Sequence, residues 1–161
     1  MLELRALQIP ISWATVDLGL TGPGTAPPQI DVADVRAWLD ETLGDDTAPA
    51  DATDVLVAID DDHDPRALAH RLALESCADT DTELRKWQLV MLRRCLNELP
   101  DDPFYAALAL ADFWAQFGVH ESPPAPSSDT FQRHLEPKDR EALLSANEGW
   151  LRVTSAYVVK P

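Results

Sequence analysis

Cysteine is scarce in this chain of 161 residues, which contains Cys77 and Cys95 and no others. Two thiols provide neither a disulfide framework nor the Cys-x-x-Cys spacing of a zinc or redox site, so we expect both to be buried and reduced. Long apolar runs are also missing. The most apolar stretch, 104–117, is interrupted by Asp112 and Gln116 and falls short of the roughly 18 residues that a membrane helix needs. With no readable secretory signal, a cytoplasmic protein is expected.

Positive charge is scarce as well. The chain has 13 Lys and Arg side chains against 28 Asp and Glu side chains, which gives a formal net charge of −15 and a pI near 4.4. Such a protein repels phosphate backbones and anionic lipid, so neither a nucleic acid nor a membrane is expected as its partner. The charge favours a basic protein partner. Most of it lies between residues 31 and 102, where 19 acidic side chains face 7 basic ones.

Catalytic motifs are absent from the sequence. No Gly-x-Ser-x-Gly elbow is present, and Gly19, Gly22 and Gly24 lack the Lys-Ser/Thr that follows a phosphate-binding loop. We therefore predict a protein that is not an enzyme and needs no cofactor or metal. An alternative stays open, a small metal-dependent enzyme that uses the Asp60-Asp61-Asp62-His63-Asp64 cluster for Mg²⁺ or Mn²⁺. Consecutive residues rarely converge on one ion, and Asp is favoured at a helix start, so helix capping explains the cluster better.

The residues that are present predict helices. With 45% hydrophobic residues and 5 Trp, the chain can form a core, and we expect a single domain over 1–161 with loops at 21–30 and 119–130. The apolar segment 55–59 fits a strand or a helix, and a helix is chosen because no second strand candidate exists to pair with it. The predicted fold is all-α, an irregular helical bundle or a short α-solenoid of about six to eight helices. Helix starts are predicted at Asp31, Thr53 or Asp54, Asp64 before Pro65, Thr80 with Glu83 as a capping box, Asp102 before Pro103, and Pro137.

The apolar spacing also predicts which residues form the core. The helix that begins at Thr80 has a very broad apolar face, and the helix over 104–117 is apolar all round except for a polar stripe. Gly44 and Gly118 are expected to end helices, and another helix is expected to end near Cys77. The core is predicted to contain Trp87, Met91, Phe104, Leu108, Trp114 and Leu144.

The candidate functional residues are acidic side chains at helix junctions and the polar stripe. Most acids lie between helices, so we expect two acidic rims at the helix ends that attract a basic partner. The alternative is that these side chains only cap helices and keep the chain soluble. The segment 119–129 is the next candidate for the interface. The predicted partner-binding residues are Asp45, Asp46, Asp61, Asp62, Tyr105, Asp112 and Gln116.

Three groups of residues together resemble a family of bacterial domains of unknown function that is grouped with the immunity proteins of polymorphic toxins. They are Trp13-x-x-Val16-x-x-Gly19-Leu20 with a later Trp38-Leu39, then Lys86-Trp87, and then Asp102-Pro103 leading into Asp112-Phe113-Trp114-Ala115-x-Phe117-Gly118. Where that family is expected to carry a Tyr-Pro-acid pattern, this chain has Val119-His120-Glu121-Ser122-Pro123-Pro124.

The resemblance implies an all-helical, non-enzymatic protein that neutralises a cognate toxin by binding it. The residues of these motifs are mostly Trp, Leu, Phe and Gly, which build a core and name no active site. A second function therefore stays open beside the immunity protein. It is an acidic accessory or regulatory module that docks on another basic protein.

Overall fold

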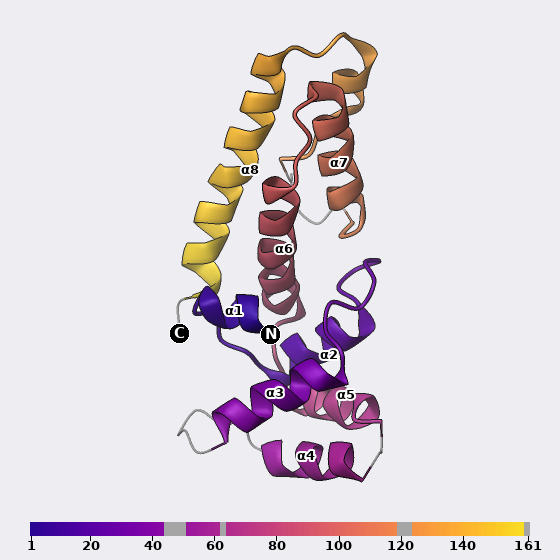
Figure 1. Cartoon of the computed structure of the whole chain (residues 1–161), viewed down its shortest axis with the longest axis vertical. Coiled ribbons are helices and arrows are strands. Elements are labelled where there is room, and N and C mark those ends of the chain that lie inside the picture. The colour runs from indigo at the N-terminus through magenta and orange to yellow at the C-terminus, as the bar shows by residue number, and fades with distance from the viewer. Residues whose placement is uncertain (44–50, 62–63, 119–123, 160–161) are drawn as a thin grey trace. The chain divides into compact units, whose positions relative to one another are not determined.

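The computed structural model describes residues 1–43, 51–61, 64–118 and 124–159. Within these ranges the chain forms eight α-helices and one 3-10 helix, and no strand is present (Figure 1). The all-α prediction is confirmed, and the ambiguous segment 55–59 is helical. Among the helices of these ranges, none combines the length and the apolar character that crossing a membrane requires. The helices are α1 (Leu2–Ala6), α2 (Trp13–Thr21), α3 (Val32–Thr42), α4 (Ala52–Asp60), α5 (Arg66–Glu75), α6 (Thr80–Asn97), α7 (Pro103–Ala115), η1 (Ser128–Gln132) and α8 (Pro137–Val158).

The chain divides into two compact units. The first unit contains Met1–Pro23 and Pro27–Trp87, and the second contains Gly24–Ala26 and Gln88–Lys160. Helix α6 contributes residues to both units, since its sequence runs across the boundary. The expectation of a single domain over 1–161 therefore stays a prediction.

In the first unit, α2 packs along α5 and α3 packs along α4. Trp87 is buried there, and its indole Nε1 donates a hydrogen bond to the backbone oxygen of Thr15 at 2.8 Å. Gly19 lies against the Trp87 ring so closely that a Cβ at this position would overlap it. Trp13 meets Trp38 edge to face, with ring centroids 5.5 Å apart. These contacts show that the tryptophans of this unit build its core.

In the second unit, α7 packs against α8 around Trp114. The Trp114 indole Nε1 donates to Oδ1 of the fully buried Asn147 at 2.9 Å. The ring meets Phe113 and Trp150 edge to face, each with a centroid distance of 5.0 Å. Asn147 Nδ2 in turn donates to the backbone oxygens of Leu143 and Pro124. Every polar atom of this buried amide is thus paired. Trp114 and, in the first unit, Trp87 are confirmed as core residues.

The predicted core is wrong at two positions of α7. Phe104 is 44% exposed and Leu108 is 40% exposed, while Met91 and Leu144 are half-buried. A helix that is apolar on all sides does not reveal from its sequence which face will pack. Helix α7 buries a side that combines small residues near its start with large apolar residues near its end. The buried residues on α7 are Ala106, Ala107, Leu110, Phe113 and Trp114.

Several helix starts follow the predicted caps. The Asp31 side chain accepts a hydrogen bond from Asp34 N at the start of α3, and Asp102 caps α7 with Pro103 at its first position. Pro137 begins α8 as predicted. Helix α5 begins one residue later than predicted, with Pro65 as its N-cap and Arg66 as its first residue, although Asp64 Oδ1 accepts a hydrogen bond from Arg66 N.

Two predicted starts are wrong. Helix α4 begins after Asp51, before both predicted caps. At α6 the residue before Thr80 acts as the cap, since Asp79 Oδ2 accepts from Thr82 N at 3.2 Å. The Thr82 hydroxyl and amide bonds lower the pKa of Asp79. The predicted capping box of Thr80 and Glu83 is thus replaced by a cap at Asp79.

Several helix ends also differ from the sequence-based expectation. Helix α5 ends at Glu75, and Cys77 follows in a left-handed conformation with φ of 50°. Cys77 is exposed rather than buried, because it lies in the turn beyond the packed part of the helix. Cys95 is half-buried, and this burial raises the pKa of its thiol. Gly118 has the expected positive φ, whereas Gly44 lies outside the described residues.

Candidate functional site

The exposed side of α7 carries three large apolar or aromatic side chains and one carboxylate, which we call the α7 strip: Phe104, Tyr105, Leu108 and Asp112. Tyr105 is the most exposed of its apolar members, at 61%. The Phe104 ring meets the Tyr105 ring edge to face, with centroids 5.8 Å apart, and meets Phe131 of η1 in the same way at 6.0 Å. The Phe104 ring therefore contacts a ring on each of two neighbours, Tyr105 and Phe131, while both Phe104 and Tyr105 remain exposed to solvent.

Acidic side chains adjoin the α7 strip at both ends. Asp101 and Asp102 precede the helix, and Asp102 Oδ1 accepts hydrogen bonds from Phe104 N and Tyr105 N. Asp112 is exposed two turns further along. Arg140 lies 3.6 Å from Asp101 and also donates to the backbone oxygen of Pro100 at 2.8 Å. The strip thus combines exposed aromatic rings with negative charge.

Gln116, the third member of the predicted polar stripe, is half-buried and acts within the second unit. Its backbone oxygen accepts hydrogen bonds from Thr25 N at 2.8 Å and from Thr25 Oγ1 at 3.1 Å. Its side-chain amide donates to the backbone oxygen of Asp112 at 3.2 Å. Gly24 has φ of 65° and approaches the same Gln116 oxygen so closely that a Cβ would collide with it. Gln116 therefore anchors the segment Gly24–Ala26.

Of the predicted acidic residues, Asp61 lies within the described part of the chain, at the C-cap of α4, and is exposed. Asp45, Asp46 and Asp62 lie outside the described residues. Beside Asp61, the carboxylate of Asp60 pairs with Arg36 at 2.7 Å, so part of the charge at this helix end is compensated.

The two units carry different charge. The first unit contains 18 acidic and 6 basic side chains, a formal net charge of −12, while the second unit has a net charge of −3. Within the described ranges, no three His, Cys, Asp or Glu side chains are grouped so as to hold a metal ion. Asp62 and His63 of the candidate metal cluster lie outside those ranges.

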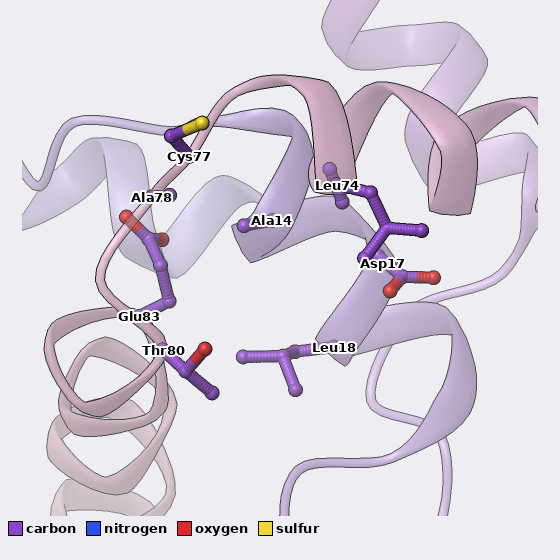
Figure 2. A pocket seen from close by; sticks show the side chains of 9 residues that line it. Ala14, Asp17, Leu18, Leu74, Cys77, Ala78, Thr80 and Glu83 are labelled. Atoms are coloured by element: carbon purple, nitrogen blue, oxygen red, sulfur yellow. The ribbon is translucent and has the colours of Figure 1, made fainter.

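A pocket of about 190 Å³ lies within the first unit, among α2, α5 and the start of α6 (Figure 2). Its walls are mainly small or apolar side chains, and it is partly open. In the view of Figure 2, Asp17, Leu18 and Leu74 lie on one side of the pocket and Thr80 and Glu83 on the other. The lining residues are Ala14, Asp17, Leu18, Ala73, Leu74, Cys77, Ala78, Thr80 and Glu83.

Glu83 forms a buried polar network beside this pocket. One carboxylate oxygen accepts a hydrogen bond from Thr15 Oγ1, and the other lies 2.7 Å from Lys86 Nζ. All three residues are buried. The ion pair of Glu83 and Lys86 thus lies in the interior and not at the surface. The spacing of Glu83 and Lys86, three residues apart on a helix, indicates a pair but not its depth.

The second carboxylate of the pocket belongs to Asp17 on α2. Its Oδ2 lies 2.9 Å from Nδ1 of His70 on α5, and its side chain is 16% exposed. His70 itself is 60% exposed. The pair links the two helices that pack most closely in this unit, and it belongs to none of the sites that the sequence predicts.

Comparisons of the chain with protein-family models, with curated proteins and with solved structures find no match. Function is therefore inferred from the side chains described above. The α7 strip offers aromatic rings and carboxylates to a large partner, whereas the pocket of the first unit offers a small hollow with two carboxylates in its lining.

Proposed function

We propose that this chain is a non-enzymatic binding protein for a basic partner protein. The observation that carries the proposal is the α7 strip, in which Phe104, Tyr105 and Leu108 are exposed next to carboxylates. Tyr, together with Trp and Arg, is enriched among the residues that dominate the binding energy at protein interfaces. We further propose that the partner is a toxin domain, because the motif resemblance implies an immunity protein.

The chemistry of the α7 strip favours a partner with apolar and positively charged side chains. Arg and Lys are attracted to the faces of Tyr and Phe rings as well as to carboxylates. Asp102 caps α7 immediately before Phe104 and Tyr105, and Asp112 is exposed two turns further along, so α7 offers a partner both rings and carboxylates. An acidic partner would instead meet like charge, which disfavours binding.

The net charge of the chain supports the same partner class. A net charge of −15 creates an electric field that attracts a basic protein before contact and raises its association rate. The first unit supplies −12 of that charge. We therefore propose that the first unit accelerates the encounter and that the α7 strip supplies contacts that hold the complex.

The test uses the basic protein encoded by the neighbouring gene in the native genome, purified and mixed with this chain. Replacing both Phe104 and Tyr105 by Ala is expected to weaken binding by roughly 30-fold or more, as at interface hot spots. Isothermal titration calorimetry measures this change. Tyr157→Ala is the matched control, because Tyr157 is also an exposed tyrosine of the second unit, on α8, and its replacement is expected to leave affinity unchanged.

A growth assay separates toxin neutralisation from docking on an accessory partner. If the partner alone stops growth of its host and co-expression of this chain restores it, the immunity function is supported. If the partner binds without being toxic, the accessory module is the correct function. An affinity that is equal for the double Ala variant and the unmodified chain would show that the α7 strip is not the interface.

A further inference from the structure

We infer that the pocket of the first unit binds a primary alkylammonium group, carried either by a small aliphatic amine or by a lysine side chain. The inference goes beyond the proposed function, because it rests on residues of the first unit and not on the α7 strip. It is argued from the walls of the pocket, from the charges that line it and from its size.

The walls fit an aliphatic chain. The small side chains of Ala14, Ala73 and Ala78 leave space for a ligand. Leu18 and Leu74 add apolar surface to the walls. Leu74 is 69% exposed, so a ligand in the pocket would cover apolar surface that now faces solvent. Covering that surface favours binding by the hydrophobic effect, but it does not select a charged ligand.

Asp17 gives the lining a negative charge that favours a cation, whereas the charge of Glu83 is compensated by Lys86. Asp17 and Glu83 line the pocket, and no Lys, Arg or His does. Both oxygens of Glu83 are already engaged, by Thr15 and by Lys86, which fixes this carboxylate in one orientation. Asp17 binds His70 through Oδ2, and a carboxylate retains further acceptor sites after one such bond. Asp17 is thus the group that we assign to the ammonium.

The size of the pocket limits the ligand. Its volume is about 190 Å³. Pockets for drug-sized molecules are larger, from about 300 Å³ upward. A linear amine of four or five carbons, or the side chain of one lysine, has the right size. An arginine is less suited, because its guanidinium pairs best with both oxygens of one carboxylate, and Oδ2 of Asp17 is already bonded to His70.

The first experiment titrates the full chain with n-pentylamine and with 1-pentanol, which has a similar shape and no charge. Binding is followed by the backbone amide signals of α2, α5 and α6 in two-dimensional NMR. We expect pentylamine to bind at least tenfold more tightly than pentanol and to shift signals around Asp17 and Ala73. Equal affinity for the two compounds, or shifts confined to other helices, would overturn the inference.

Two variants locate the ammonium. Asp17→Asn keeps the shape of the side chain and is expected to weaken pentylamine binding at least tenfold. Asp54→Asn is the matched control, because Asp54 is an exposed acid of the same unit, outside the pocket, and its replacement changes the net charge equally. If both variants weaken binding to the same extent, the amine responds to the general field of the protein, and the pocket is not its site.

Cys77 provides a second readout that does not depend on NMR. Its exposed thiol lines the pocket, so bound pentylamine should slow its reaction with iodoacetamide, whereas the half-buried Cys95 serves as the internal reference. Protection of Cys77 that is lost in Asp17→Asn supports the inference. Protection that persists in Asp17→Asn contradicts it, provided that far-UV circular dichroism shows the variant to be as helical as the unmodified chain.

A lysine probe separates the two sources of the ammonium. Binding of Nα-acetyl-lysine amide with an affinity near that of pentylamine identifies a lysine of a protein chain as the ligand. Binding of pentylamine alone identifies a free amine. Failure of both probes to bind would overturn the inference and leave the proposed function intact, since that function is tested on α7.

Discussion

Each unit has a buried tryptophan, Trp87 or Trp114, whose indole nitrogen donates a hydrogen bond, but the two acceptors are of different kinds. In the first unit Trp87 donates to the backbone oxygen of Thr15, and in the second Trp114 donates to the side chain of Asn147. A backbone acceptor remains whatever side chain is substituted there, whereas a side-chain acceptor can be lost by mutation. The second unit therefore depends on one buried amide.

The units differ in the same way in their charges. The first unit places an ion pair, Glu83 with Lys86, in its interior, while the ion pair of Arg133 with Asp139 in the second unit involves a cation whose side chain is 55% exposed. Desolvated charges interact strongly and are costly when one of them is left alone, whereas exposed pairs contribute little. We expect the first unit to be the more sensitive to single charge changes.

The largest expected effect concerns the aromatic core of the second unit. Trp114→Ala removes a ring that is 5% exposed, and it also leaves Asn147 Oδ1 without its donor. The free energy of unfolding is expected to fall by about 3–5 kcal/mol, the range for large-to-small changes of buried aromatic residues. Urea unfolding followed by circular dichroism measures the change. A loss below about 1 kcal/mol would show that the ring is not packed as described.

The next effect tests the interior ion pair of the first unit. Lys86→Met leaves the Glu83 carboxylate buried with Thr15 as its remaining partner, which is expected to destabilise the protein by about 3 kcal/mol. Replacing Glu83 and Lys86 together by Met removes both charges and should recover most of that loss. Chemical denaturation of the two variants gives the comparison. If both variants lose the same free energy of unfolding, the buried ion pair does not make the first unit sensitive to single charge changes.

A kinetic effect tests the charge difference between the units. Changing Asp45, Asp46, Asp61 and Asp62 to Asn is expected to slow association with a basic partner by about tenfold at low salt and to change dissociation much less. Surface plasmon resonance at several salt concentrations separates the two rates. An association rate that responds neither to these changes nor to ionic strength would mean that the acidic side chains serve solubility alone.

The smallest effect concerns the exposed ion pair of the second unit. Hydrogen bonds from Arg133, with a further bond from the backbone NH of Glu136, lower the pKa of Asp139 from 3.8 to about 2. Because the folded-state pKa is the lower one, its stabilisation is present above about pH 4 and is lost as the pH falls towards 2. Arg133→Gln should raise the Asp139 titration midpoint in carboxyl NMR towards its ordinary value. An unchanged titration midpoint would show that Arg133 is not what lowers the pKa of Asp139.

Local signals in the sequence predicted the helices well because caps act over a few residues. Asp31 and Asp102 accept hydrogen bonds from amides at most three residues away. Helices α1 and α2 were missed, and η1 begins inside the predicted loop 119–130. At α2 the signal was present, because Ser12 and Thr15 form a capping box at its start. Thr in place of the usual Glu or Gln at the third helical position hides that signal.

The sites were harder to predict because they depend on contacts between distant residues. Thr15 and Glu83 are 68 positions apart, and Asp17 and His70 are 53 apart, so no local pattern indicates that they meet. The sequence did identify Tyr105 and Asp112 as an exposed stripe of α7. It did not show that Phe104 and Leu108 share that exposed side, because periodicity is uninformative on a helix that is apolar all round.

The contact between Gly24 and Gln116 has a consequence for dissecting this chain. Residues 24–26 belong to the second unit, while the residues before and after them, Pro23 and Pro27, belong to the first. The second unit is therefore built from two separate segments of the chain, the short segment 24–26 and the long segment that begins at Gln88. No single cut in the gene yields both units complete, and a fragment that starts at residue 88 lacks the Thr25 donors of the Gln116 oxygen.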